Sequence, residues 1–402
     1  MTWTRLRMRV TTPLFNGGAD PTERSSAQPG VRVPSLRGAM RFWFRALMGG
    51  VIGPNLELLA ELEHRVFGST AACCPVPMRI PNPPPQRPAG TSRMPWGICY
   101  LLGQGLGDLG KATTIRPYVA PGPDAEFDLE LRLDRADVGA AAATLASLWL
   151  LCAYGGIGAR TRRGFGGVRI IGAEGWLPPP WTTESILSPN LDHYEKLRYL
   201  WLDATLGNCL LPLLQGKITY SQSAWEVPPT FPVLHRKYTI AGASGGGVFD
   251  SWADTLRYAG QQLRYFRASQ DNPAARYTPA RKTPEWERVI WGAEKHFPLG
   301  ALGLPVVFKK NGPSVNAERN SEQLRRASPL WLRAVGCGDE WRLFSFAFLG
   351  EFLPGPNAMT VFLRNGGKSE KLQVDSDDIS RLTRQWIDTL AADESFFDIR
   401  RR

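Results

Sequence analysis

The chain has 402 residues, of which 43% are hydrophobic and 21% charged, a composition typical of a globular protein that is too long for one small core. No run of about 18 uncharged apolar residues is present, which excludes a membrane-spanning helix, and the start MTWTRLRMRV lacks the apolar core of a signal peptide, so we expect a cytoplasmic protein. The net charge of +11 indicates a polyanionic partner.

Arginine dominates the positive charge. Of the 48 basic residues ten are lysines and 38 are arginines. Guanidinium groups suit bidentate contacts with phosphates, which favours a nucleic-acid partner, although a GC-rich genome also enriches arginine. Charge by itself does not separate nucleic acid from a membrane surface or an acidic protein.

The first expected element is a strand over residues 3–10, in which apolar and basic residues alternate. Period-two alternation predicts a half-buried strand with a basic outer face. The apolar face carries Leu6, Met8 and Val10, and the basic face carries Arg5, Arg7 and Arg9.

A helix is expected next, with Ser35 as its N-cap. Its apolar stripe is formed by Leu36, Met40, Trp43, Phe44 and Leu47. Beside the stripe, Arg37, Arg41 and Arg45 recur every four residues, so they lie in one row and repel one another unless an anion is bound. The alternatives are a solvated face, or pairing with acidic residues of the following segment, of which the candidates are Glu57, Glu61 and Glu63.

The rest of the first half completes a βαββαβ order. After a second helical segment at 55–67 and a proline-rich loop at 74–95, strands are expected at 97–102 and 126–133, and a helix capped by Asp137 leads to a strand at 168–171. This order is ferredoxin-like, with one helical segment inserted, and small sheets of this type commonly bind RNA.

The glycine-rich stretch YGGIGARTRRGFGGVR, residues 154–169, carries most of the functional argument. Its glycines allow positive φ and a close approach of the backbone to a ligand, and its arginines suit phosphate. Phe165 either stacks on a base or anchors the loop in the core. The candidate RNA-binding residues here are Gly156, Gly158, Arg160, Arg162, Arg163, Gly164, Phe165 and Gly166.

Other chemistries have weaker signals. The dinucleotide fingerprint Gly105-x-Gly107-x-x-Gly110 is followed by a β-branched, proline-broken segment instead of the helix that it requires, and the glycine-rich stretch is not a Walker A loop. The six cysteines have no C-x-x-C spacing and are expected to be buried thiols, and the four histidines form no ligand pair. We therefore expect no metal and no cofactor.

The second half predicts a second domain with a similar order and long insertions. Its glycine run at 242–247 carries no arginine. Helices are expected at 190–206, 251–267 and 376–391, and strands at 232–240, 304–308, 330–335 and 341–349. The resulting fold class is α+β, with two tandem ferredoxin-like (RRM-like) domains over residues 1–180 and 181–402.

Several blocks resemble the RAMP superfamily of CRISPR systems, in the order and spacing of one of its families. They are TPLFNGGADP at 12–21, VRVPSLRGAMRFWFR at 31–45, EHRVFGS at 63–69, the glycine-rich stretch, LGLP at 302–305 and RRASPL at 325–330. That family is the large two-domain RAMP subunit, numbered first, of the type III-B (Cmr) effector complex. The proline-rich loop at 74–95 is not clearly part of its pattern.

The resemblance implies a non-catalytic subunit of an antiviral ribonucleoprotein. Such a subunit binds CRISPR RNA or its paired target RNA near the 3′ end of the guide, caps a filament of other RAMP subunits, and has no membrane partner. Carried over to this sequence, the RNA-facing residues are the arginine row and the glycine-rich stretch.

Two rival functions remain open from the sequence. RAMP relatives that process CRISPR precursors use a histidine as general acid/base, and His64 is the histidine nearest the basic motifs, although no acid or orienting group is evident beside it. A basic scaffold that binds only protein would instead have its arginines paired with carboxylates.

Overall fold

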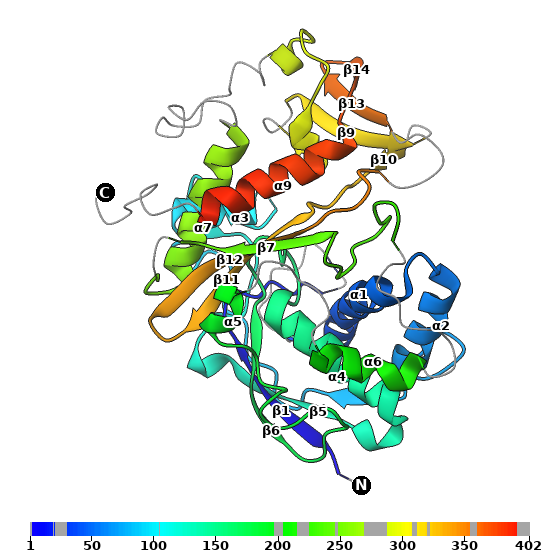
Figure 1. The fold of residues 1–402 in the computed structure, drawn as a ribbon. Coiled ribbons are helices and arrows are strands. Elements are labelled where there is room, and N and C mark those ends of the chain that lie inside the picture. Colours follow the sequence, from blue (N-terminus) through cyan, green and yellow to red (C-terminus); the bar gives the residue numbers. More distant parts are fainter. Residues whose placement is uncertain are drawn as a thin grey trace.

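The computed structural model describes residues 2–18, 20, 30–103, 105–196, 204–214, 225–245, 248–268, 288–307, 312–319, 322–353 and 360–391. The protein is a mixed α+β structure with several small antiparallel sheets (Figure 1). No helix of these residues is long and apolar enough to cross a membrane.

The first sheet has β1 (Thr4–Val10) near its centre. β1 pairs antiparallel with β5 (Glu126–Leu131) on one side and with β6 (Val168–Glu174) on the other, and the short β2 (Met78–Arg79) pairs with β5. The order β2-β5-β1-β6, with helices after β1 and β5, is that of a βαββαβ unit, as predicted for the first half, but its second strand is β2, from the segment predicted to be a proline-rich loop, and not the segment 97–102.

Three helices belong to this unit. α1 (Val33–Ile52) begins two residues before Ser35, which was predicted as its N-cap. The N-cap is Arg32, whose side chain forms no capping hydrogen bond, and Pro34 fits the first turn of the helix. α2 (Leu56–Phe67) confirms the helical segment predicted at 55–67, and Asn55 is its N-cap, whose side chain accepts from the Leu58 amide at 3.0 Å. α4 (Val138–Tyr154), capped by Asp137, is buried from Gly139 onward, as expected of a helix that is apolar all round.

The predicted strand at 97–102 is wrong, because this segment is the helix α3 (Trp96–Leu102). It crosses α7 (Trp252–Ala268) so closely that a Cβ on Gly97 would lie 2.2 Å from the Arg257 carbonyl oxygen. The periodicity of a short apolar run does not show whether the run forms a strand or a helix. In this structure the segment is helical and packs against α7, which lies about 150 residues later in the chain.

The dinucleotide fingerprint lies in a β-hairpin of β3 (Gly107–Asp108) and β4 (Thr113–Thr114). The segment after the fingerprint is the strand β4 and not the helix that would hold a pyrophosphate, as the sequence predicts. The cysteines are buried at 99, 152 and 209, whereas Cys73 is exposed and Cys74 partly exposed, which departs from the prediction of buried thiols.

The second half contains a three-stranded sheet in the order β11-β12-β7, formed by β11 (Leu330–Cys337), β12 (Glu340–Phe348) and β7 (Thr239–Ala243). The prediction of β11 and β12 is confirmed. The predicted strand at 232–240 is mostly wrong, because a turn in which the Tyr238 amide bonds to the His235 carbonyl precedes β7.

A further sheet in the order β10-β9-β13-β14 extends this half, with β8 beside β9. Its strands are β8 (Val306–Val307), β9 (Ser314–Arg319), β10 (Glu322–Leu324), β13 (Thr360–Asn365) and β14 (Lys368–Leu372). The remaining elements are α5 (Leu191–Lys196), α6 (Ala204–Leu214), α9 (Ser376–Ala391) and the 3-10 turns Pro123–Ala125, Leu133–Arg135 and Pro298–Leu302. Residues 197–203 of the predicted helix at 190–206, residue 308 of the strand predicted at 304–308, and residues 246–247 of the glycine run lie outside the described residues.

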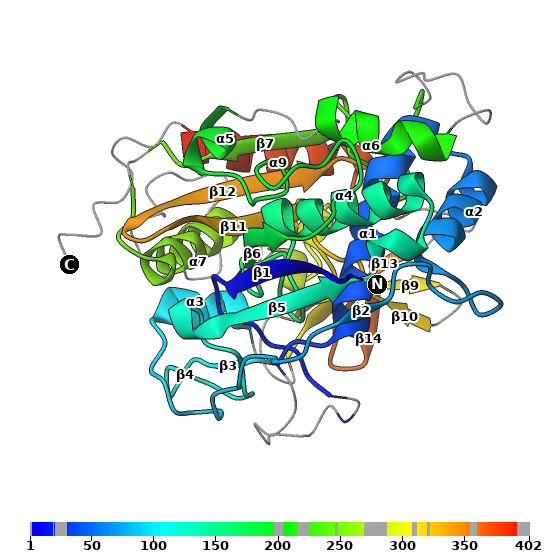
Figure 2. The ribbon, with the colours of Figure 1, turned by 90° about the horizontal axis from the view of Figure 1, so that it is seen from below.

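The two halves stack in layers: the first sheet, α1 with α4, the β11-β12-β7 sheet, and α7 with α9 (Figures 1 and 2). The Trp43 ring of α1 lies 5.7 Å from that of Trp331 on β11, and Tyr154 of α4 lies 6.1 Å from Phe344 on β12. Arg333 of β11 donates to the Cys152 carbonyl of α4 at 2.9 Å. Both faces of the β11-β12-β7 sheet are therefore covered, so neither offers an open platform for RNA.

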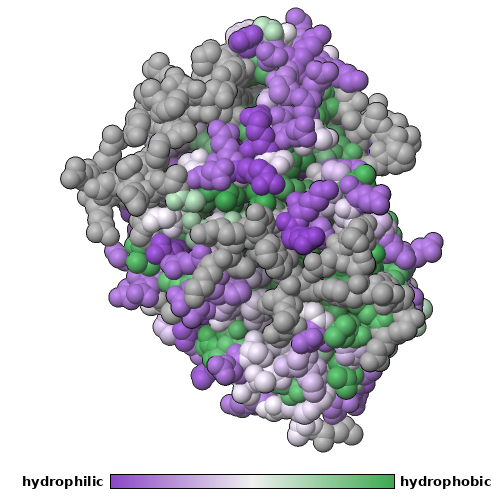
Figure 3. Space-filling view, in the orientation of Figure 1, coloured by the Kyte–Doolittle hydropathy of each residue, from purple (hydrophilic) through white to green (hydrophobic). Residues whose placement is uncertain are grey.

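The two hydrophobic clusters cross between the halves. The larger one joins α1 and α4 to aromatic residues of β12, and the other joins Phe15 and α3 to α7, β11 and α9. On the face shown in Figure 3, hydrophilic side chains gather over α9, β13 and β14.

Candidate nucleic-acid interface

The glycine loop, residues 155–167, is held on two sides by backbone hydrogen bonds. On one side, the Ala159 amide donates to the Phe15 carbonyl at 2.7 Å and the Gly166 amide to the Pro13 carbonyl at 2.9 Å. On the other, the Leu332 amide of β11 donates to the Arg162 carbonyl at 3.1 Å. The loop therefore bridges the two halves of the chain.

The loop glycines are required by contacts within the protein. Gly158 has φ +88°, and a Cβ there would lie 2.2 Å from the Phe15 carbonyl oxygen; Gly166 has φ +69°, and its Cβ would lie 2.0 Å from the Ile157 carbonyl oxygen. Added carbons at Gly156 and Gly164 would also lie within 3 Å of protein atoms. These glycines therefore allow neighbouring protein atoms to approach the loop backbone closely. From the sequence we expected them to allow the close approach of a ligand.

Phe165 is the anchor of the loop and does not present a face to RNA. Its side chain is fully buried and packs edge-on against Phe15, with ring centroids 5.9 Å apart. The placement of Phe165 among the RNA-binding residues is therefore wrong, because stacking on a base requires an exposed ring. Of the two roles weighed from the sequence, the core anchor is the one observed.

Six arginines from three segments gather beside the loop. We call them the arginine cluster: Arg160, Arg162, Arg163, Arg267, Arg325 and Arg326. The first three belong to the glycine loop, Arg267 lies in the last turn of α7, and the last two precede β11. Within the described part of the chain, none of the six forms an ion pair with a carboxylate.

The cluster is a site of mutual repulsion. Burial, followed by the charge of Arg325, lowers the pKa of Arg160. The pKa of Arg163 is lowered to about 10, first by burial and then by the charge of Arg267. The pKa of Arg326 is also lowered to about 10, first by burial and then by the charge of Arg162. With pKa values of about 10, Arg163 and Arg326 remain protonated at neutral pH, and an anion bound among the arginines would relieve the repulsion.

A cavity of about 240 Å³ opens beside the cluster. Arg162 forms part of its wall, donating to the Ser328 carbonyl at 3.0 Å and lying over the Trp331 ring at 5.2 Å. Arg326 donates to the Ala301 carbonyl at 2.9 Å and lies over the Phe352 ring at 4.9 Å. The cavity thus combines cations with aromatic walls.

The arginine row of α1 has a different environment. Arg41 and Arg45 both bond to the buried Glu63 of α2, at 2.8 Å and 2.5 Å, and Arg41 also donates to the Gly68 carbonyl. Burial alone would raise the pKa of Glu63, but the hydrogen bonds from Arg45 and Arg41 outweigh it and hold this pKa below its ordinary value. Pairing with an acidic residue, one of the alternatives left open by the sequence, is what the structure shows for these two arginines.

Arg37, the third member of the row, has no ion pair among the described residues, and its Nε atom is buried without a partner.

The basic outer face of β1 is neutralised by carboxylates, as Arg41 and Arg45 are. Arg7 and Arg9 pair with Glu126 at 3.0 Å and 2.5 Å, and Arg5 lies within 4 Å of three carboxylates.

His64, the candidate general acid/base, is exposed on α2. Its imidazole has no hydrogen-bond partner in the part of the chain that the structure describes, so the orienting group of an acid–base pair is missing there.

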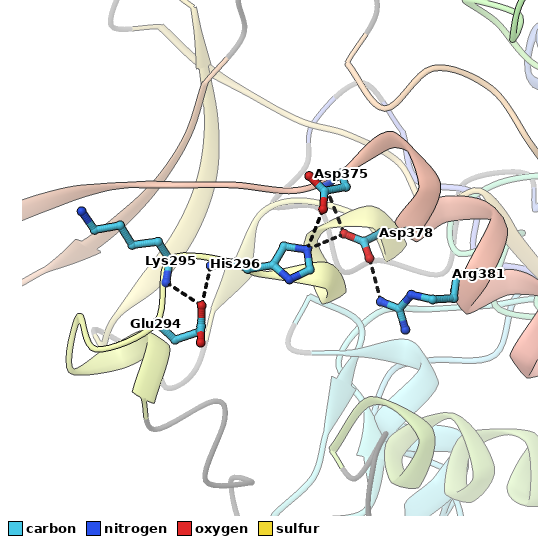
Figure 4. Close-up of polar contacts among 6 residues, drawn as sticks. All are labelled: Glu294, Lys295, His296, Asp375, Asp378 and Arg381. Atoms are coloured by element: carbon cyan, nitrogen blue, oxygen red, sulfur yellow. Dashed lines mark hydrogen bonds and ion pairs between the residues drawn. The ribbon is translucent and has the colours of Figure 1, made fainter.

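His296 has a more structured environment, which the sequence did not reveal because its partners lie about 80 residues away (Figure 4). Its Nε2 atom lies 3.0 Å from an Asp378 oxygen and 3.2 Å from an Asp375 oxygen. Asp378 also accepts from the Asp375 amide and from Arg381, so it closes the first turn of α9 as a capping box does. The group ties the segment before Pro298–Leu302 to α9, and its polar atoms bond to one another.

The chain is similar to several known proteins. A model of the RAMP superfamily matches residues 7–92 and 101–169. The CRISPR system Cmr subunit Cmr1-1 of Pyrococcus furiosus is 29% identical over 313 residues, which cover 77% of this chain and 78% of that protein. Subunit Cmr1-2 of the same organism is 46% identical over 63 residues, 16% of this chain and 31% of that one.

The crystal structure of Cmr1 from Pyrococcus furiosus in its apo form is similar in fold, with a TM-score of 0.51 at 20% identity over 96% of this chain and 97% of that one. The sequence blocks, the βαββαβ order of the first sheet and these matches agree with one another. Residues 7–92 and 101–169 carry the pattern of the RAMP superfamily, and the chain is homologous to the Cmr1 subunits of Pyrococcus furiosus.

Proposed function

We propose that this protein is a non-catalytic RNA-binding subunit of a cytoplasmic type III-B CRISPR effector complex. It holds the CRISPR RNA, or the duplex of guide and target RNA, near the 3′ end of the guide and caps the filament of RAMP subunits that are its protein partners. The observation that carries the proposal is the arginine cluster, in which six guanidinium groups meet without a carboxylate partner among the described residues.

Phosphates are the anions that such a cluster suits. Successive phosphates of an RNA backbone present a row of negative charges, and guanidinium forks bind them bidentately. Because the phosphate backbone that these arginines suit is the same at every nucleotide, we expect slight sequence preference and a steep loss of affinity with salt. Arg160 and Arg325, both exposed, are the principal contacts.

The residues that we propose to bind RNA therefore differ in part from those expected from the sequence. Arg160, Arg162 and Arg163 remain in it, Arg267, Arg325 and Arg326 join it, and the glycines support it. Arg41 and Arg45 leave it because Glu63 already neutralises them. Arg37 stays a candidate at its edge, because no carboxylate pairs with it in the described chain.

We also infer that the two halves, 1–180 and 181–402, are tandem ferredoxin-like domains. The connectivity β7-α7-β11-β12-α9 and the strand order β11-β12-β7 support this inference, since they match a ferredoxin-like unit up to its last strand. The sheet of β8–β10, β13 and β14 is then an insertion.

The proposal is tested by titrating the protein with single-stranded RNA across salt concentrations. Replacing Arg160 and Arg325 together by glutamine is expected to lower affinity about tenfold or more and to reduce the log–log salt slope by about 2, roughly one for each lost phosphate contact. The charge-matched control replaces Arg7 and Arg65, which are exposed and paired with Glu126 and Asp137. Equal losses in both variants would mean that net charge, and not the cluster, attracts the RNA.

A further inference from the structure

We propose that the cavity beside the arginine cluster receives a single unstacked nucleobase of the bound RNA, while the neighbouring phosphates lie on the rim arginines. This inference rests on the proposed function, because it assigns a second binding element to the same interface. The residues that carry it are Arg162, Arg325, Arg326, Phe231, Trp331 and Glu351.

The size and position of the cavity suit one base. Its volume of about 240 Å³ is below the roughly 300–1,000 Å³ of pockets for drug-sized molecules, so it accommodates one planar ring system and not a run of nucleotides. Arg325, which lines it, is also the neighbour of Arg160 in the cluster. A backbone that follows the cluster therefore passes the mouth of the cavity.

The chemistry of the lining suits a base better than an aliphatic side chain. Aromatic rings and arginine planes are the surfaces on which bases stack, and Phe231 is a half-buried ring of the wall. Trp331 is 4% exposed, and its indole N–H has no acceptor in the described structure. Buried donors of this kind are normally paired, and a carbonyl on a base edge is an acceptor of the right type.

The charges of the lining point the same way. Burial lowers the pKa of Arg162 to about 10, and that of Arg326 falls to about 10 from burial followed by the charge of Arg162. Two buried cations, Arg162 and Arg326, beside the aromatic rings of the cavity favour a ligand in which a planar ring is joined to an anion, as in a nucleotide. Glu351, the carboxylate in the lining, forms no ion pair among the described residues and can accept from an amino or imino group of a base.

The test compares a short oligouridylate with an abasic ribose-phosphate chain of equal length and charge. We expect the wild-type protein to bind the oligouridylate at least fivefold more tightly, since stacking of one base on aromatic side chains contributes roughly a five- to hundredfold effect. Ala327, an exposed residue of the cavity lining, is replaced by tryptophan to fill the cavity. This A327W variant should lose the preference and keep both the affinity for the abasic chain and its salt slope.

The matched control is Ala71→Trp, which adds the same bulk at an exposed site outside the cavity lining and should keep the preference. Thermal melting of all three proteins checks that they fold alike. Equal binding of the two ligands by the wild type, with a normal salt slope, overturns the cavity inference and leaves the proposed function standing. Failure to bind either ligand at low salt overturns the proposed function instead.

Two further outcomes also overturn the inference. If A327W keeps the base preference, the bases stack elsewhere. If A327W keeps the preference but no longer assembles with other RAMP subunits, the occupant of the cavity is a protein segment.

Discussion

The arginine row of α1 and the arginines of the glycine loop look alike in sequence and differ in electrostatic environment. In both, three arginines lie within nine residues, next to apolar segments. On α1, Glu63 takes two of the three guanidinium groups into a buried ion pair. At the loop, the neighbours are further arginines from α7 and from the segment before β11. An arginine motif thus gains its role from the charges that the fold brings to it.

The difference has an energetic side. An ion pair with a buried carboxylate fixes α2 against α1, and removing the carboxylate leaves two cations without their partner. The cluster at the loop has a cost in the free protein that an anion removes on binding. Stability should therefore respond to changes at α1, and RNA affinity to changes at the cluster.

The largest expected effect comes from the anchor that holds the loop arginines in place. Phe165→Ala should lower the free energy of unfolding by about 3–5 kcal/mol, because a fully buried ring leaves a cavity. Denaturant unfolding measures this loss.

Phe165→Leu serves as the control for that change. It should cost less stability and leave RNA affinity unchanged. A loss of RNA affinity in the leucine variant at nearly normal stability would return Phe165 to the binding surface.

The next largest effect is expected at Glu63, the carboxylate that pairs with the arginine row of α1. Glu63→Gln should lower the free energy of unfolding by about 1–3 kcal/mol at neutral pH, since its side chain is 7% exposed and bonds to two arginines. RNA affinity should not fall.

The effect should depend on pH. Because the pKa of Glu63 is lower in the folded protein than in the unfolded chain, its ionisation stabilises the fold above the unfolded pKa, and this contribution is lost as the pH falls through the folded pKa. Glutamine does not titrate, so the difference between wild type and variant should shrink on acidification. A difference that stays constant from neutral to acidic pH would contradict the ion pair.

A smaller effect is expected when Arg41 and Arg45 are replaced together by glutamine. RNA affinity should change by less than about twofold, in contrast to the tenfold loss for the charge-matched Arg160 and Arg325 pair. Filter binding at one salt concentration is sufficient for the comparison. Similar losses in the two double variants would show that α1 also contacts the RNA.

The smallest effect is expected at His64. We expect no metal-independent cleavage of CRISPR repeat RNA by the wild type, and His64→Ala should leave RNA affinity and stability unchanged, because the imidazole is exposed and unsupported in the described structure. Cleavage that the variant abolishes would favour the endoribonuclease alternative.

Local signals predicted many of the elements correctly. The alternation of β1, the cap Asp137, the uniform apolarity of α4 and the strands β11 and β12 are all visible within a short window of sequence. The short α3 was misassigned, and β13 and β14 were not predicted, because short runs carry weak periodicity and their form depends on distant partners.

The candidate site was predicted only in part. The glycine loop is visible as a motif, and the RRASPL block was noted, but nothing local indicates that Arg325 lies beside Arg160 or that Arg267 lies beside Arg163. Glu63 was one of three acidic candidates, and only the packing of α2 on α1 selects it.

By itself, the sequence determined the helices and strands with strong periodicity, the excess of arginine and the resemblance to the RAMP superfamily, since these depend on residues near one another in the chain. The tertiary structure decided which arginines are neutralised, that Phe165 is an anchor, and that the charged loop meets the second half of the chain. The reason is physical: backbone preferences act between neighbours in sequence, whereas Coulomb and packing forces act between neighbours in space.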